Sequence, residues 1–200
     1  MSLFPSSPAP SLIVPRSIQP TRVSVAHSMK RQRRGGMYQA WGFTLTWENM
    51  SRARFAPIWG FSIALQGQAQ NFTYVPPVLG SRQATGAGTP LVKTTTALGR
   101  SIPIKGMSPG ATLGLVGDHV KFANHTKVYM LTADAVADGS GDVTIAIEPW
   151  LYSEVSVNEA LTLDSIPFTM LLLGDVRETE LYGGQQDGPF KFQLEMVEDV

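Results

Sequence analysis

The chain has 200 residues, of which 43% are hydrophobic, so it is long enough to bury a core of its own and is not predicted to be disordered. Sixteen Lys and Arg balance sixteen Asp and Glu, which excludes an overall field that would attract nucleic acid or an anionic membrane. The absence of cysteine excludes disulfides, thiolate metal sites and thiol nucleophiles. No apolar run approaches the roughly 20 residues of a membrane-spanning helix, and residues 1–10 lack the basic region of a secretory signal, so we expect a soluble protein made in a cytoplasm.

The first 16 residues are expected to form an extended arm outside the core, because four prolines interrupt them and no apolar period is visible. Alternation begins at Thr21, where Val23 and Val25 are separated by polar residues, and predicts a half-buried strand. A basic run then leads into Gly35-Gly36, and a second alternating run follows it. Together these features predict a long β-hairpin with a basic tip.

The period changes after Trp47, where apolar residues recur at spacings of three and four and predict one face of a helix. Ser51 or Asn49 is suited to cap its start. Pro57 would cost roughly 3 kcal/mol in a helix interior, so the helix should begin near Ala56 or be kinked at Pro57. A short strand over residues 71–75 is expected to end at the double proline that follows.

Composition shifts at residue 80, where a Gly-, Thr- and Ala-rich stretch to residue 90 predicts a linker or exposed loop. Short β-prone runs separated by turn residues follow, at residues 91–95, 113–116, 119–122, 127–135 and 143–147, and predict a small sandwich or barrel. Two more strands are expected at residues 168–173 and 190–197. The predicted organisation is an arm of residues 1–16, a hub of residues 17–79 and 166–200, and an inserted β-domain of residues 80–165.

Three stretches, taken together and in order, resemble a known family. The first is Arg33-Arg34-Gly35-Gly36 followed by the Trp41 strand, and the second runs from residue 51 (SRAR) through the helix to Phe72-Thr73 and the double proline. The third and most specific consists of residues 117–122 (GDHVKF), 127–133 (KVYMLTA), 137–141 (ADGSG) and 147–149 (IEP). In content and order these stretches resemble the distal tail or minor tail proteins of long-tailed (siphovirus-like) phages, from about residue 17 to the end.

The resemblance implies an all-β fold with one helix: a tail-tube-like β-sandwich or split-barrel hub that carries an inserted small β-barrel or sandwich. It implies a structural virion protein of the tail tip, made in the host cytoplasm. Such a protein forms a homo-oligomeric ring that connects the tail tube protein to the baseplate hub proteins. DNA passes through the lumen without specific binding, and no membrane is entered. Residues 37–40 separate the double glycine from Trp41 by more than the family pattern does, which predicts a longer hairpin tip.

Two sets of residues are candidates for assembly. The basic run would contact another subunit or face the channel, with a solvated hairpin tip as the alternative; it consists of Lys30, Arg31, Arg33 and Arg34. Aromatic residues of the hub strands would build the ring, with ordinary core packing as the alternative; they are Trp41, Phe43, Trp47, Phe190 and Phe192.

No catalytic residue, metal site or cofactor is predicted, and an enzyme is not expected, because no nucleophile with a base and no pair of carboxylates has a recognisable spacing. Asp134, Asp138 and Asp142 are four residues apart, which fits a hairpin turn better than a calcium loop. The main alternative function is a carbohydrate-binding β-domain that contacts the host surface, with Tyr129, Trp150 and Tyr152 as platforms for sugar stacking. A function as another minor tail or tail-assembly protein is a further alternative.

Overall fold

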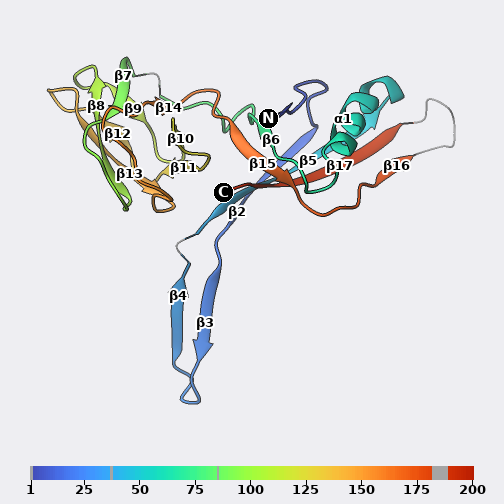
Figure 1. The fold of residues 1–200 in the computed structure, drawn as a ribbon, viewed down its shortest axis with the longest axis horizontal. Coiled ribbons are helices and arrows are strands. Elements are labelled where there is room, and N and C mark those ends of the chain that lie inside the picture. The colour runs from blue at the N-terminus through green and yellow to red at the C-terminus, as the bar shows by residue number, and fades with distance from the viewer. Residues whose placement is uncertain (1, 37, 85, 182–188) are drawn as a thin grey trace. The chain divides into compact units, whose positions relative to one another are not determined.

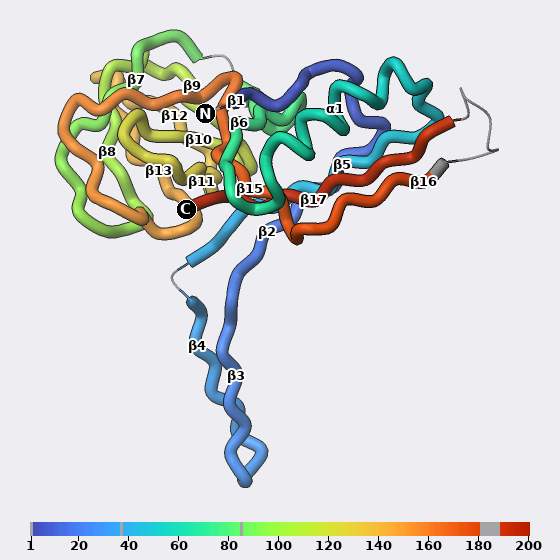
Figure 2. Tube along the Cα trace, turned by 45° about the vertical axis from the view of Figure 1, so that its right-hand side comes forward, coloured from blue at the N-terminus to red at the C-terminus, as the bar shows by residue number. Residues whose placement is uncertain are grey.

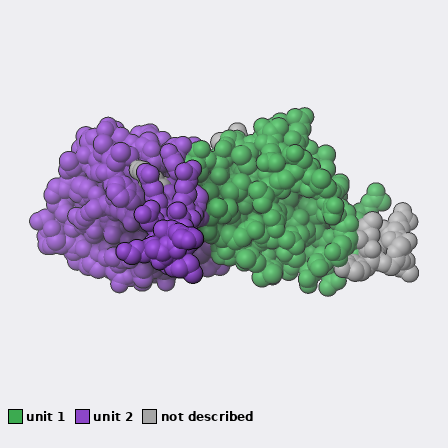
Figure 3. Space-filling model, turned by 90° about the horizontal axis from the view of Figure 1, so that it is seen from below, with its two compact units in different colours: residues 1–18, 40–74, 169–200 green, residues 19–39, 75–168 purple. Residues whose placement is uncertain are grey.

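The computed structural model describes residues 2–36, 38–84, 86–181 and 189–200. These residues are mainly β with a single helix, which confirms the predicted all-β class. Contacts divide the chain into two compact units, shown in green and purple in Figure 3. Unit 1 consists of Met1–Ile18, Ala40–Tyr74 and Thr169–Val200, and unit 2 of Gln19–Gln39 and Val75–Phe168.

Unit 1 is built on a seven-stranded sheet (Figure 1). Six strands follow one another across it: β1 (Ser2–Leu3), β6 (Phe72–Tyr74), β15 (Phe168–Leu172), β17 (Phe190–Glu198), β5 (Ala40–Met50) and β2 (Leu12–Ile18), while β16 (Thr179–Leu181) pairs with β17. The central pair β5 and β17 is antiparallel, with Leu194 opposite Leu45 and Met196 opposite Phe43. Because side chains alternate along a strand, these apolar residues share one face, and they are buried there.

The helix α1 (Arg52–Ala64) covers that apolar face. It begins directly after Ser51, one of the two expected cap residues, and not near Ala56; the Ser51 side chain makes no capping hydrogen bond. Phe55 stacks on Phe190 with ring centroids 4.7 Å apart. Pro57 lies inside the helix rather than at its start. The carbonyl that loses its partner to this proline belongs to Ala53, and both residues are exposed, so water can take the place of the missing N–H.

The N-terminal residues are not an arm outside the core, which corrects the prediction. β1 pairs with β6, and β2 pairs with β5 along its whole length. Phe4 is buried against Trp47, Phe61, Phe72 and Tyr74. The indole N–H of Trp47 donates to the carbonyl of Pro8 at 2.9 Å. The N-terminal segment therefore closes the core of unit 1.

Unit 2 contains a nearly closed β-barrel. Its six-stranded sheet has the order β14 (Leu161–Thr162), β10 (His119–Phe122), β11 (Val128–Leu131), β13 (Val143–Glu148), β8 (Ser101–Met107) and β7 (Gly88–Val92). A bridge between Leu91 and Ala160 brings the two ends of this sheet together. A two-stranded ribbon of β9 (Thr112–Gly114) and β12 (Ala135–Val136) accompanies it. The barrel removes most of the free sheet edges of this unit.

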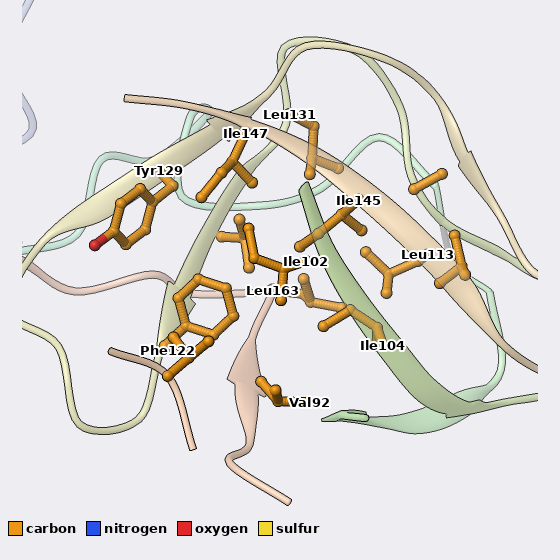
Figure 4. Close-up of a cluster of buried hydrophobic side chains, with 14 of the residues drawn as sticks. Val92, Ile102, Ile104, Leu113, Phe122, Tyr129, Leu131, Ile145, Ile147 and Leu163 are labelled. Atoms are coloured by element: carbon orange, nitrogen blue, oxygen red, sulfur yellow. The ribbon is translucent and has the colours of Figure 1, made fainter. Parts of the chain in front are cut away.

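Alternating residues of these strands fill the barrel, as Figure 4 shows. On β13, Val143, Ile145 and Ile147 are buried, whereas Thr144, between the first two, is exposed. β8 was not expected from the sequence, yet its Ile102 and Ile104 are fully buried opposite β13. Pro103, between these two residues, lacks an N–H for the sheet but still lies opposite Thr144 of β13.

The two ends of the barrel segment are held to each other. Ser81 and Asp164 form a bridge, and the backbone N–H of Ile166 donates to the carbonyl of Gly80 at 3.0 Å. The guanidinium of Arg82 adds an ion pair with Asp164 at 3.1 Å.

Candidate interaction surface

The hairpin of β3 (Thr21–Val25) and β4 (Arg31–Gly35) stands apart from both sheets in its hydrogen bonding. Among the strands that the structure describes, each of the two pairs only with the other, and Figure 2 shows them side by side. All ten strand residues are exposed. The hairpin was predicted to join β3 to the Trp41 strand through a basic tip, and this is wrong, because three of the four predicted cations lie along β4 and the turn consists of residues 26–30.

The basic hairpin, defined as Gln19–Gln39, contains Arg22 and the predicted Lys30, Arg31, Arg33 and Arg34, but no Asp or Glu. Arg22 lies directly opposite Arg34, and like charges in that position destabilise a strand pair. No side-chain hydrogen bond or ion pair joins any of the five cations to another residue that the structure describes. The hairpin is therefore a positive element without internal neutralisation.

One face of the hairpin combines positive charge with apolar surface. Val23 is opposite Arg33 and Val25 is opposite Arg31, so these four side chains share a face. The two valines are 56% and 55% exposed. Apolar side chains at this exposure with cations beside them are the composition of a protein contact surface, in which arginine stems and aliphatic groups are buried together.

The base of the hairpin is attached to the barrel. The N–H of Gly36 donates to the carbonyl of Pro20 at 2.8 Å and closes the base. Tyr38 contacts Tyr152 edge to face at 6.2 Å, and the ammonium of the buried Lys127 donates to Gln39 Oε1 at 2.9 Å. Residues 38–40 were expected to lengthen the hairpin tip; instead they lie after β4, at its base.

The aromatic residues proposed to build the ring lie inside unit 1. Trp41, Phe43, Trp47 and Phe192 are buried, and Phe190 is stacked on Phe55 of the helix. Buried side chains cannot provide the exposed surface of a subunit contact, so the structure assigns these residues to core packing.

The candidate sugar platforms separate into one buried and two exposed residues. Tyr129 is fully buried and its hydroxyl accepts the N–H of Tyr152, so it cannot stack on a sugar, and that prediction is corrected. Trp150 is 40% exposed, but the guanidinium of Arg100 lies 5.2 Å from its ring centroid. Tyr152 is 51% exposed and forms a pair with Tyr38, which the sequence did not single out.

A serine and a histidine do meet on the barrel, at residues that the sequence did not connect. His125 Nε2 lies 3.1 Å from Ser153 Oγ, and its Nδ1 lies 2.9 Å from the Tyr129 hydroxyl. The carbonyl oxygen of Glu154 lies 3.2 Å from Nε2 and can only accept a hydrogen bond, so the imidazole proton lies on Nε2 and Nδ1 accepts the Tyr129 O–H. A general base for Ser153 needs a free Nε2. The network instead fixes the segment after Trp150.

The acidic residues at the barrel turn are each engaged separately. Asp138 accepts backbone N–H groups of Ser140 and Asp142 at 2.7 and 3.0 Å, and these bonds lower the pKa of Asp138. Asp142 pairs with Lys93, and Asp134 accepts the N–H of Val116. In the part of the chain that the structure describes, no group of three or more His, Asp or Glu could hold a metal ion.

His119 is the most perturbed histidine. Burial lowers its pKa to about 4, against the opposing effects of the Leu79 backbone and Asp118, while Lys127 adds to the lowering. Its ring contacts Phe168 edge to face at 5.6 Å. His119 is thus held neutral where the segments at both ends of the barrel domain pass.

No family model matches the chain, and no curated protein matches it either. None of the helical segments among the described residues is long and apolar enough to cross a membrane.

Proposed function

We propose that the protein is a structural subunit of the tail tip of a long-tailed phage, in the position of a distal tail protein. The observation that carries the proposal is the basic hairpin, whose ten strand residues are all exposed. A two-stranded hairpin without a core is at best marginally stable in water. Such an element fits a subunit that is completed by assembly.

The edge of the unit 1 sheet supports assembly independently. β2 is the last strand of that sheet, and its Leu12, Val14 and Ile18 are 40–54% exposed. Edge strands with exposed apolar residues pair readily with other chains, and a closed ring of identical subunits satisfies such edges.

The sequence resemblance supplies the kind of assembly. Strands, helix, strand, inserted β-domain and strands follow one another in the chain in the order that the resemblance implies for a distal tail protein. In this role the ring joins the tail tube to the baseplate hub and DNA passes through its lumen without specific binding. The barrel contacts other tail proteins or the host surface. The work of the protein is assembly, and no chemical step is required.

Electron microscopy of the purified chain tests this function. Closed rings with a central opening wide enough for duplex DNA are expected, either alone or after addition of the tail tube protein. A chain that stays monomeric with and without its tail partners would overturn the proposal.

A second candidate is carbohydrate binding by the barrel, which the exposed pair of Tyr38 and Tyr152 favours. Exposed aromatic faces stack on sugar rings. A glycan array probed with the full chain and with a Tyr152→Ala variant tests it: binding that the variant loses supports this function, and no binding above background excludes it.

A further inference from the structure

Charge is segregated along a chain that is neutral as a whole. The basic hairpin holds five of the 16 Lys and Arg and none of the 16 Asp and Glu, so the other residues carry a net charge of −5. Residues 169–200 contain seven Asp and Glu against two Lys and Arg. Two copies of such a chain can bind each other, because the positive patch of one attracts the negative patch of the other and fixes the register of the contact.

The exposed part of this negative region is the acidic strip, defined as residues 173–180, in which three carboxylates outnumber the single, half-buried Arg177. Asp175, Glu178 and Glu180 are exposed there, and Val176 between them is 73% exposed. Glu178 forms no side-chain hydrogen bond or ion pair with any residue that the structure describes, whereas Glu180 lies 4.0 Å from Lys191. The strip leads into β16, which pairs with β17 along one edge; no other described strand pairs with it. An open strand edge of this kind can accept another chain.

We propose that the basic hairpin of one copy docks on the acidic strip of a second copy. The inference rests on the proposed ring and names the contact that would build it. Arg31 and Arg33 meet the carboxylates, and the valines on the same face of the hairpin, Val23 and Val25, cover Val176. The two surfaces differ, so the contact is head-to-tail and can repeat around a closed ring.

The exposed valines favour a protein partner over a polyanion. A phosphate backbone neutralises cations but offers no apolar surface to the half-exposed Val23 and Val25. A second copy of the chain offers both the carboxylates and an exposed valine.

Charge reversal on each side tests the contact. An Arg31→Glu/Arg33→Glu variant and a Glu178→Arg/Glu180→Arg variant are each expected to self-associate about 100-fold more weakly than the unchanged chain in sedimentation velocity at low salt, because like charges would face each other. Mixing the two variants is expected to restore association, since each reversed surface then meets its complement. Recovery in the mixture, which a folding defect could not produce, supports the proposal.

An Arg52→Glu/Arg54→Glu variant is the matched control. It makes the same change in charge at two exposed residues of the first turn of α1, where acidic residues favour the helix. It should associate like the unchanged chain. If the hairpin variant also still forms rings, the docking is overturned while the proposed function stands; if the unchanged chain forms none with or without its tail partners, the function itself falls.

Two further readouts identify the partner. The chain has no cysteine, so a Val23→Cys chain mixed with a Val176→Cys chain should form a disulfide-linked pair. A Leu98→Cys chain, which places the cysteine at an exposed position of unit 2, should not form such a pair with the Val23→Cys chain. If the hairpin variant keeps its self-association but loses binding to a short DNA duplex that the unchanged chain binds, nucleic acid is the partner and the proposal is wrong.

Discussion

The barrel and the basic hairpin belong to the same unit, yet one has a dense core and the other has none. In the barrel, inward residues of β7 to β13 are almost fully buried and the bridge at Leu91 joins the sheet ends. In the hairpin, every strand residue is exposed and two arginines face each other. The barrel is stabilised by what it buries itself, whereas the hairpin depends on what another molecule buries.

The largest effect should come from truncating the barrel core. Ile145→Ala removes fully buried atoms and should lower the free energy of unfolding by about 2–5 kcal/mol. Val25→Ala on the hairpin should change it by less than about 0.5 kcal/mol. Urea denaturation followed by circular dichroism measures both, and equal losses would break the comparison.

Backbone strain at the barrel turn gives the next effect. Gly141 has a φ of +78°, and an added Cβ would lie 2.2 Å from the carbonyl oxygen of Met107. Gly141→Ala should therefore cost about 2 kcal/mol. Gly139→Ala in the same turn meets nothing within 4 Å and should stay within about 0.5 kcal/mol in thermal or urea unfolding. If Gly141→Ala left the free energy of unfolding unchanged, the turn would have to be able to move away from the added Cβ.

Acidification should weaken the barrel through His119. Its folded pKa of about 4 lies below the ordinary 6.5, so the unfolded chain takes up the proton first and stability falls as the pH drops from 6.5 toward 4. Between pH 7.5 and 5.5 the loss should be about 1 kcal/mol. A His119→Gln variant should lack this part of the pH dependence when urea unfolding is measured at both pH values. If the free energy of unfolding of the variant falls as steeply with pH as that of the unchanged chain, other groups cause the pH dependence.

The smallest effect on the isolated chain should come from the hairpin cations. Arg34→Gln relieves the repulsion from Arg22 and should shift the free energy of unfolding of the monomer by less than about 0.5 kcal/mol. The same variant should leave self-association nearly unchanged, because Arg34 lies on the face of the hairpin opposite to Arg31 and Arg33. Urea unfolding of the dilute chain and sedimentation of the concentrated chain measure these two quantities; a large change in monomer stability would mean that the hairpin is packed within its own chain.

Elements with a clear apolar period could be predicted from the sequence. The helix after Ser51 and the alternating strand near the C-terminus both formed as expected, since each buries one regular face. Pro57 could not be placed correctly because its cost depends on whether the freed carbonyl meets water, which only the fold decides.

Elements whose stability comes from pairing with another strand, and not from an apolar pattern of their own, were missed. β4 has the sequence RQRRG, without the β-branched or aromatic residues that mark a strand, and it forms by pairing with β3. The first strands of unit 1 were hidden by prolines, although the consecutive Leu12, Ile13 and Val14 were a signal for β2.

The candidate site could be predicted only in part. The basic run was visible as a charge cluster, but its counterpart at Glu178 was not, because a net charge of zero hides segregation between segments. The hub aromatics were assigned to a surface because alternation shows that a strand has an apolar face without showing what covers it; α1 covers it here.

The joined ends of the barrel segment make this part of the chain replaceable. Ser81 and Asp164 form a bridge, so a foreign domain needs only two adjacent termini to take the same place between β6 and β15. Recombination between related genes could then exchange the barrel as a cassette while the hub stays intact, and the same property makes it a convenient point for grafting a new binding module.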